Sequence, residues 1–487
     1  MQYEIERSSM HKSLRNLIVS AGGAASLMLA VGTQALGGSD SSSQVWYVNL
    51  LAAGGEDGMS WGSAFTDLQD ALGSAVAGDE IWVASGQYTP TADGQRSVSF
   101  QLPSGVGVYG GFVGYESQRE QRDSTNEVTV LSGDLSGDDL PGFVNGGENS
   151  LHVVVCNGGN ESTVLDGFTI RGGFTDGSGS DQSGAGLSNS NTSVTVRACR
   201  FEGNLATGNG AGISNVDSNP NIVGCTFTEN KCWGGGAAMW NNRSSPVIVN
   251  SLFARNAHAG SNGESGGIYI GAGSGPLIVN CTFTENTANQ SNGGAIFIHP
   301  FNSASLPTRI YNSIFWNNSD TNGVDTDIGA DHSYSDPYAG AVVQHSMIEQ
   351  GFDGDGNTSA DPLFADPDAG DYRLGAGSSA IDSADSDAYD GPLVDIAQVS
   401  RFLDDPSSEN SGSGSLTYLD RGAYEFGSSS CPADLAPPFG SLDFSDVIAF
   451  LTAFNAQDHI ADLAPPTGVF DFSDVIEFLI AFGAGCP

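Results

Sequence analysis

Basic residues are scarce in this chain. Its 487 residues include 16 lysines and arginines against 57 aspartates and glutamates, which gives a formal net charge of −41. Such a surface repels phosphate backbones and anionic lipid, so nucleic acid and anionic membranes are poor partners, whereas divalent cations or high-salt solubility are favoured. Cysteine is sparse as well, and 7 residues do not make a dense disulfide framework.

The central part of the chain also lacks the periodicity of amphipathic helices, and it carries an internal repeat instead. Each copy has a phenylalanine followed three residues later by an asparagine, and the copies are 26, 26, 30 and 32 residues apart. The pairs are Phe201 with Asn204, Phe227 with Asn230, Phe253 with Asn256, Phe283 with Asn286, and Phe315 with Asn318. A period of this size with small insertions predicts a solenoid.

Equivalent residues of successive copies form columns, and each column has one structural role. Five residues before each phenylalanine lies an apolar residue that we expect to face inward: Val196, Ile222, Ile248, Ile278 and Ile310. Three residues before it lies a turn-forming column: Ala198, Gly224, Asn250, Asn280 and Asn312. Short strands separated by such corners leave no room for crossover helices. The sequence therefore predicts an all-β protein, a right-handed parallel β-helix.

A second strand follows a glycine cluster in each copy, as in Gly-Gly-Ala-Ile at residues 293–296. Together with Phe-Thr-Glu-Asn at residues 283–286, this resembles the paired repeats of polymorphic-outer-membrane-protein-type β-helices, within the pectin-lyase-like fold. The resemblance implies the fold and leaves the function open. Stacked Cys199 and Cys225 are close enough to bridge in such a fold, but buried free thiols are the simpler interpretation.

The sequences at the two ends of the chain predict export of the protein and capping of the β-helix. Residues 1–37 combine basic residues, a short apolar run and a small-residue cleavage pattern, as in a signal peptide. The β-helix is expected over residues 45–426, with a helix at residues 66–77 covering its first coil. Residues 361–425 resemble the closing segment of secreted β-helix proteins, and the resemblance implies a C-terminal cap. A Gly/Ser linker follows at residues 427–430.

Residues 431–487 form a separate unit, in which one loop–helix motif occurs twice at a spacing of 28 residues. Two short helices that bury one face against each other are predicted by apolar residues at helical spacing, which are Val447, Ile448, Phe450, Leu451 and Phe454, and Val475, Ile476, Phe478, Leu479 and Phe482. Cys431 and Cys486 frame the unit, and in an exported protein they predict a disulfide.

This C-terminal unit resembles the dockerin family, in the variant that ends Gly-Ala-Gly-Cys-Pro. The resemblance implies attachment to a surface or scaffold component and calcium binding by acidic loop residues. The candidate ligands are Asp434, Asp443, Asp446, Asp462, Asp471 and Asp474. Alanine and proline occupy other ligand positions, so the alternative is that these aspartates cap the helices.

A catalytic site on the β-helix has one candidate set. Glu229, Arg255 and Glu285 occupy successive coils, which places the two glutamates about two strand spacings, roughly 9 to 10 Å, apart, as in inverting glycosidases. Arg255 between them favours two ionised carboxylates, however, and a general acid must hold a proton. An ion ladder on the outer face is the alternative interpretation.

Two kinds of binding site are also candidates. Trp240, Tyr269 and Phe297 occupy the outward position of the second strand in three coils and could stack on sugar rings, unless a loop covers them. Acidic clusters with ligand-like spacing could bind calcium, and they are Asp134, Asp138 and Asp139, and Asp353, Asp355, Asn357 and Asp361.

The sequence therefore predicts a secreted, cell-surface-associated β-helix that acts as a structural, adhesive or carbohydrate-binding element. The alternative function is a polysaccharide lyase or glycoside hydrolase acting on an acidic polysaccharide, so enzymatic activity stays open. Expected partners are a polysaccharide and the component that recognises the C-terminal unit. Neither nucleic acid nor integral insertion in a membrane is expected.

Overall fold

The structure is a computed structural model. It describes residues 43–124, 128–261, 264–289, 293–299, 307–320, 327–330, 338, 341–427, 435, 444–456, 461, 470 and 472–484. Contacts within the chain divide it into two units, Met1–Ser42 and Ser43–Pro487. The predicted signal peptide, residues 1–37, lies outside the described residues. None of the described helices is long and apolar enough to cross a membrane.

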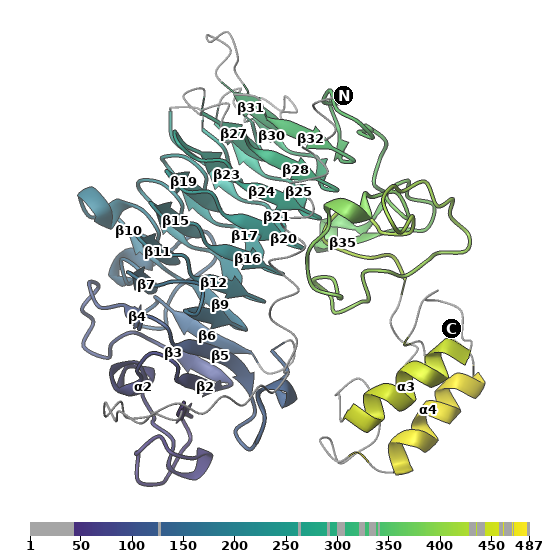
Figure 1. Cartoon of the computed structure of the whole chain (residues 1–487). Coiled ribbons are helices and arrows are strands. Elements are labelled where there is room, and N and C mark those ends of the chain that lie inside the picture. Colours follow the sequence, from purple (N-terminus) through teal and green to yellow (C-terminus); the bar gives the residue numbers. More distant parts are fainter. Residues whose placement is uncertain are drawn as a thin grey trace, which may run out of the picture. The chain divides into compact units, whose positions relative to one another are not determined.

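Parallel strands of the described residues form four sheets, which the chain visits in turn (Figure 1). Sheet A contains β1 (Val45–Val48), β2 (Glu80–Ala84), β5 (Gly107–Phe112), β8 (Val164–Asp166), β12 (Thr195–Arg197), β16 (Asn221–Val223), β20 (Val247–Val249), β24 (Leu277–Val279), β28 (Arg309–Tyr311) and β32 (Val342–Gln344). Sheet B contains β3 (Gly86–Tyr88), β6 (Thr129–Ser132), β9 (Phe168–Arg171), β13 (Arg200–Glu202), β17 (Thr226–Thr228), β21 (Leu252–Ala254), β25 (Thr282–Thr284), β29 (Ile314–Trp316) and β33 (Met347–Ile348).

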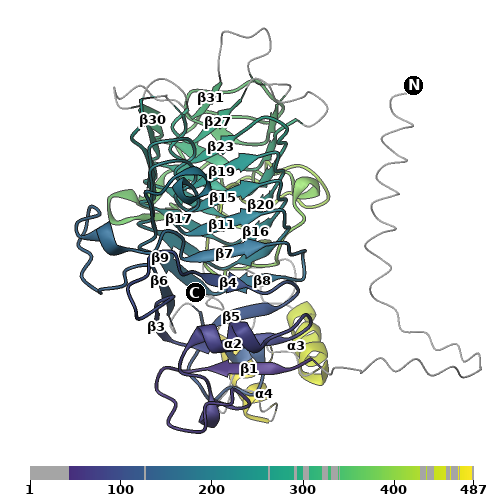
Figure 2. The same ribbon diagram turned by 90° about the vertical axis from the view of Figure 1, so that its left-hand side faces the viewer.

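Sheet C faces the viewer in Figure 2, and from β10 onward a strand of a narrow sheet D precedes each sheet C strand. Sheet C contains β4 (Phe100–Leu102), β7 (Val154–Asn157), β11 (Leu187–Ser190), β15 (Ile213–Val216), β19 (Met239–Asn242), β23 (Ile268–Ile270), β27 (Ile296–Ile298) and β31 (Ile328–Ala330). Sheet D contains β10 (Phe174–Thr175), β14 (Leu205–Ala206), β18 (Lys231–Cys232), β22 (Ala257–His258), β26 (Thr287–Ala288) and β30 (Ser319–Asp320). The predicted right-handed parallel β-helix is confirmed.

The interior of the coils is the predicted set of columns. The repeat phenylalanines are fully buried, and Phe227 stacks between Phe201 and Phe253 with ring centroids 5.0 and 4.7 Å away. Cys199 and Cys225 are free, buried thiols, as the simpler interpretation predicted. Burial raises the pKa of the Cys225 thiol to about 12, so the thiolate is disfavoured.

The asparagine column is a continuous hydrogen-bonded ladder between sheets B and D. The Nδ2 groups of the first four asparagines donate to the side-chain oxygen of the next asparagine and to a backbone carbonyl, as Asn230 Nδ2 does to Asn256 Oδ1 at 3.0 Å and to Phe201 O at 2.8 Å. At the end of the ladder, Asn318 Nδ2 donates to Asp327 Oδ1 at 3.0 Å. The corner column between sheets A and B is left-handed at every position, with φ from 48° at Ala198 to 61° at Gly224. Asparagine and glycine recur there because they tolerate this conformation.

Helix α2 (Leu68–Ser74) covers the first coil, slightly shorter than the predicted residues 66–77. Asp67 caps its N-terminus by accepting a hydrogen bond from the Gln69 amide at 2.9 Å. The last coil is closed by a turn, in which Asn357 accepts from the Ser346 amide and donates to Val343 O.

The segment that we expected to cover the last coil lies elsewhere. Residues 361–427, here called the flank segment, pack along the side of the coils and contain the antiparallel pair β34 (Phe364–Asp366) and β35 (Asp371–Leu374) (Figure 1). Corner asparagines hold the segment, since Asn280 Nδ2 donates to Asp420 O at 2.7 Å and Asn312 Nδ2 donates to Asp385 O at 2.9 Å. The flank segment therefore covers the outer face of sheet B from β21 onward.

The C-terminal unit contains α3 (Phe444–Ala456) and α4 (Phe472–Ala484). The two helices pack through Phe450 and Phe478, whose ring centroids are 4.1 Å apart. Ile448 and Leu451, which we expected on the buried face, are 53% and 54% exposed, because the helices meet along a narrower stripe. Cys431 and Cys486, and with them the predicted disulfide, lie outside the described residues.

Candidate functional site

The part of sheet B that the flank segment leaves open forms the floor of a groove. Outward side chains of β6, β9, β13 and β17 align in two columns across these strands. One column is Val130, Thr169, Arg200 and Thr226, and the other is Ser132, Arg171, Glu202 and Thr228. Neighbouring strands lie about 4.8 Å apart, so Arg171 and Arg200, the carboxylate of Glu202 and the hydroxyl groups of the threonines follow one another at regular intervals along the floor.

Two hollows of about 710 and 770 Å³ overlie this floor and share Arg171, Arg200, Glu202 and Thr226. Because of the shared lining, we treat them as one groove. Residues 139–143 form one wall, and the flank segment forms the other with Tyr424, Ile396 and their neighbours.

Arginines gather in this groove although the chain as a whole is strongly acidic. Arg171, Arg197 and Arg200 are exposed and lie on three neighbouring strands, β9, β12 and β13. Glu202 is the acid nearest to two of them, at 3.8 Å from Arg171 and 4.0 Å from Arg200. Arg197 makes no ion pair with any residue that the structure describes. Two of these guanidinium groups share one close carboxylate, and that of Arg197, on the neighbouring strand of sheet A, has none within 4.0 Å among the described residues. Other carboxylates, including those of Asp166, Glu229 and Asp395, line the groove farther from these three arginines.

Two further arginines of the groove are already neutralised. Arg122 lies 2.8 Å from the carboxylate of Asp166, which is 2% exposed, and it donates to Gly110 O. Arg255 lies 2.6 Å from Glu285 and donates to the carbonyl of Pro367 in the flank segment. These two arginines hold the groove together, whereas the exposed three remain available to a ligand.

The predicted catalytic set is brought together only in part. Glu229 and Arg255 both line the groove, but Glu285 does not. Glu285 is bound by Arg255 and accepts a hydrogen bond from the Tyr372 hydroxyl at 3.0 Å, under the flank segment. The ion pair agrees with the ladder interpretation for this half of the set, and the arrangement does not place two free carboxylates on opposite sides of a substrate.

The predicted aromatic column exists, but it is not an open platform. Trp240, Tyr269 and Phe297 pair in register, and the rings of Tyr269 and Phe297 stack at 5.5 Å. Tyr269 is 8% and Phe297 is 5% exposed, so their faces are not available to a sugar ring. The strand alternation was predicted correctly, and neighbouring groups cover the two rings.

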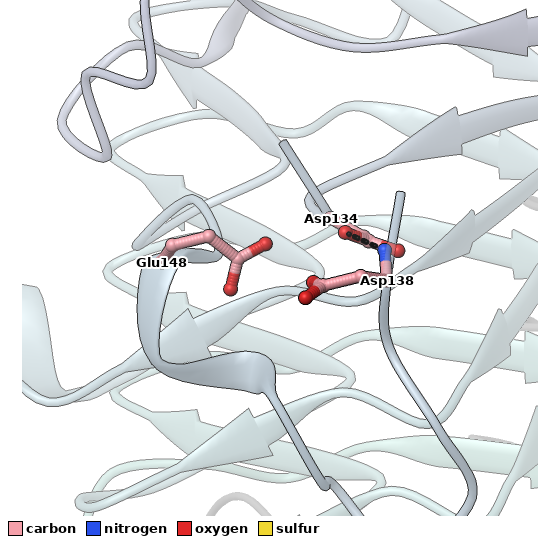
Figure 3. A group of neighbouring side chains, drawn as sticks. All are labelled: Asp134, Asp138 and Glu148. Carbon is pink, nitrogen blue, oxygen red and sulfur yellow. Dashed lines mark hydrogen bonds between the residues drawn. The ribbon is translucent and has the colours of Figure 1, made fainter. Parts of the chain in front are cut away.

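An acidic cluster lies in the loop at the groove's N-terminal end (Figure 3). Carboxylate oxygens of Asp134, Asp138 and Glu148 lie within 4.8 Å of one another and could hold a divalent cation. Burial raises the pKa of Glu148, and nearby Asp134 adds to the shift. Asp139, which we had grouped with them, instead accepts a hydrogen bond from Asn149 Nδ2 at 2.7 Å.

The other calcium candidates do not form such a group in the described part of the chain. Asn357 is used in closing the last coil, apart from Asp353, Asp355 and Asp361. In the C-terminal unit, Asp446 is buried and accepts a hydrogen bond from the Leu435 amide at 2.7 Å, and Asp474 is buried as well. The remaining four, Asp434, Asp443, Asp462 and Asp471, lie outside the described residues.

The three exposed arginines were missed by the sequence reasoning, although a signal existed. Arg200 immediately precedes the repeat phenylalanine Phe201, and Arg171 follows the equivalent Ile170 of the preceding coil. A search of the positions on either side of the phenylalanine column, extended by one coil toward the N-terminus, would have found both.

Comparison with known proteins agrees with the coils. A family model described as "Right handed beta helix region" matches residues 152–336. Among solved structures, the crystal structure of pectate lyase Pel9A is similar, with a TM-score of 0.41 and 13% sequence identity over 79% of this chain and 97% of that chain. No curated protein matches the chain. The strand topology makes the chain a right-handed parallel β-helix protein, and the family model matches part of its coils.

Proposed function

We propose that this protein is an extracellular β-helix that binds an anionic polysaccharide in the groove over sheet B. The observation that carries the proposal is the presence of three exposed arginines in the groove, Arg171, Arg197 and Arg200, with Glu202 the one carboxylate of the described residues within 4.0 Å of any of them, in a chain with a net charge of −41. An exposed guanidinium recognises a carboxylate through paired hydrogen bonds.

The rest of the groove suits a sugar chain. Thr226 and Thr228 supply hydroxyl groups along the floor, and the ring of Tyr424 supplies an apolar surface at one wall. The groove crosses several strands and is long enough for more than one sugar unit. The acidic surface around it repels a nucleic acid, whose phosphates are densely spaced. Binding without cleavage is the function we favour, because Glu285 is committed to Arg255 and Tyr372.

Replacing Arg200 or Arg197 with alanine should weaken binding of polygalacturonate about 10- to 100-fold, because each lost charge-assisted hydrogen-bond pair contributes about 1.5 to 3 kcal/mol. The measurement is isothermal titration calorimetry on the mature chain at low salt, with neutral glucans as the comparison. Absorbance of unsaturated sugar products, followed in the same samples, reports any lyase activity.

Arg243→Ala is the matched control, since Arg243 is an exposed arginine outside the groove whose partner is Asp217 at 2.6 Å. It should bind like the wild type. Equal affinity of the wild type and both groove variants would exclude the groove as the binding site.

We further propose that the C-terminal unit attaches the protein to a surface or scaffold component. Each of its helices exposes a large apolar residue at the same three places in the repeat: Phe444, Ile448 and Leu451, and Phe472, Ile476 and Leu479. Exposed apolar groups of this kind are typical of a protein-binding face.

Deleting residues 431–487 should release the protein into the medium, while the β-sheet circular dichroism and melting temperature of the coils stay unchanged. Cell fractionation and thermal denaturation measure the two effects. If the truncated protein stays on the cells, attachment depends on another part of the chain.

A further inference from the structure

The interior of the flank segment contains more acids than cations. Four of its carboxylates are almost completely removed from solvent, and they belong to Asp382, Asp395, Asp420 and Glu425, none more than 3% exposed. The buried cations among them are Arg401 and Arg421. Burying a charge is costly unless an opposite charge lies beside it, so the pairing of these six groups decides how stable the segment is.

The two arginines do not neutralise the four acids. Arg401 lies 3.4 Å from Glu425, and its other bonds go to the carbonyls of Asp420 and Gly422. Arg421 donates to carbonyl oxygens of Ser383 and Ser346 and forms no ion pair with the described residues. The acids are thus in excess, and most of their hydrogen bonds come from backbone amides.

Asp382 is the least compensated of these acids. Its Oδ2 accepts one long hydrogen bond, from the Asp405 amide at 3.3 Å, and its Oδ1 has no hydrogen-bond partner. Asp404 and Asp405 face it with the same sign of charge, and its own amide donates to the carboxylate of Asp420 at 2.7 Å. Burial, and then these neighbours, raise the pKa of Asp382 from 3.8 to about 7.

The remaining groups around this interior do not remove the imbalance. Burial raises the pKa of Asp420 to about 8, against three smaller effects in the other direction that include Arg401. Asp395 accepts hydrogen bonds from three backbone amides and faces Arg401. Tyr389 lies over Arg401, and from the coils the neutral Asn280 contacts Asp420 O. His345 is the titratable coil residue near Arg421, and burial lowers its pKa.

This interior lies directly behind one wall of the groove. The Glu425 amide donates to Asp395 at 2.8 Å, and Asp395 and the neighbouring Ile396 line the groove. Tyr424, adjacent to Glu425 in the chain, lines the groove as well. Any loosening of the acid-rich interior therefore displaces groups of the binding site.

We propose that the flank segment is a proton-controlled wall, which packs on the coils in acid and loosens as the pH rises through neutrality, so that ligand binding in the groove weakens. The second half of this proposal rests on the proposed function, whereas the first half does not.

The direction of the pH dependence follows from the linkage between proton binding and packing of the flank segment. A carboxyl group whose pKa is higher in the packed than in the loosened segment binds its proton more tightly when packed. Its contribution is fully present below its ordinary pKa and is lost as the pH rises through the packed value, here about 7 for Asp382 and about 8 for Asp420. The window of change is therefore roughly pH 4 to 8.

Hydrogen exchange of the full mature chain tests the first half. Exchange rates, corrected for intrinsic pH dependence, are measured by mass spectrometry at about pH 5.5 and about pH 8.5. Amides of residues 380–426 should open about tenfold more often at the higher pH, while amides of β13, β17 and β21 keep their protection. Unchanged protection of the flank segment, or an equal loss in the coils, would overturn the proposal.

Asp382→Asn assigns the effect to the carboxyl group. Asparagine has the same shape and tolerates the φ of +50° at this position. The variant should lose clearly less flank protection at the higher pH than the wild type, because only Asp420 of these two acids still releases a proton there. Asp368→Asn, which changes an exposed acid of the same segment, should respond like the wild type. If Asp382→Asn does not fold, the wild-type exchange data still decide whether the flank segment loosens as the pH rises. If added calcium restores protection of the flank segment at the higher pH, the acids bind a cation in place of protons. That result would overturn the proposal.

Titration of polygalacturonate at the same two pH values tests the second half. Weaker binding at the higher pH in the wild type, with a clearly smaller change in Asp382→Asn, supports control of the groove. Absence of binding at both pH values would reject the proposed function while the exchange result stands. Binding that is independent of pH, despite a loosened flank segment, would reject the control of the groove alone.

Discussion

Phe227→Ala should destabilise the coils by about 3 to 5 kcal/mol, the usual cost of a large cavity in a packed core. Phe227 is fully buried between Phe201 and Phe253, and its ring is nearly parallel to both, at interplanar angles of 5° and 1°. Neighbouring coils are held at fixed distance by their strand pairing, so the stack cannot close over the gap. Urea denaturation followed by far-ultraviolet circular dichroism measures the loss.

The matched control is Thr228→Ala, at the next position of β17, where the side chain points outward and is half-buried. Its expected cost is within about 1 kcal/mol, as for ordinary surface substitutions. A similarly small cost for Phe227→Ala would mean that the phenylalanine column does not hold the coils together.

Asn256→Ala should cost about 3 to 5 kcal/mol as well, through unsatisfied hydrogen bonds instead of a large cavity. Asn256 Nδ2 donates to Phe227 O and to Asn286 Oδ1, both at 2.9 Å, and its Oδ1 accepts from the backbone amide and Nδ2 of Asn230. All of these groups are buried, so each lost partner leaves a desolvated polar atom.

Asn242→Ala provides the comparison, because Asn242 is a half-buried asparagine at the end of β19 outside the ladder. It should change the free energy of unfolding by less than about 1 kcal/mol. Equal effects of the two substitutions would show that water replaces the ladder bonds at no cost.

The coils could be predicted from the sequence because repetition makes each structural role visible several times. A single asparagine at position 280 carries little information, but asparagine or glycine at four of five equivalent positions indicates a left-handed corner, which the φ values confirm. The outward position of Tyr269 followed from strand alternation, whereas its burial did not, because burial depends on groups outside its own strand.

The groove could not be predicted, because it is defined by a segment without repetition. Residues 361–427 carry no period that reveals where they pack. They cover sheet B from β21 onward, and β6 to β17 are therefore left open. The pairing of Asp138 with Glu148 likewise depends on the path of a loop that no spacing rule describes. For the same reason, we interpreted the flank segment as a cap.

Variation in coil length is confined to one part of the circumference. The corner between sheets A and B and the asparagine turn between sheets B and D keep a constant length from β12 to β30, while the connections on either side of sheet C lengthen. Coil-to-coil pairing depends on the constant part, so a whole coil is a unit of duplication that joins its neighbours through the same contacts. During evolution such a protein can therefore gain or lose whole coils and vary the loops beside sheet C, while the strand pairing of the remaining coils stays the same.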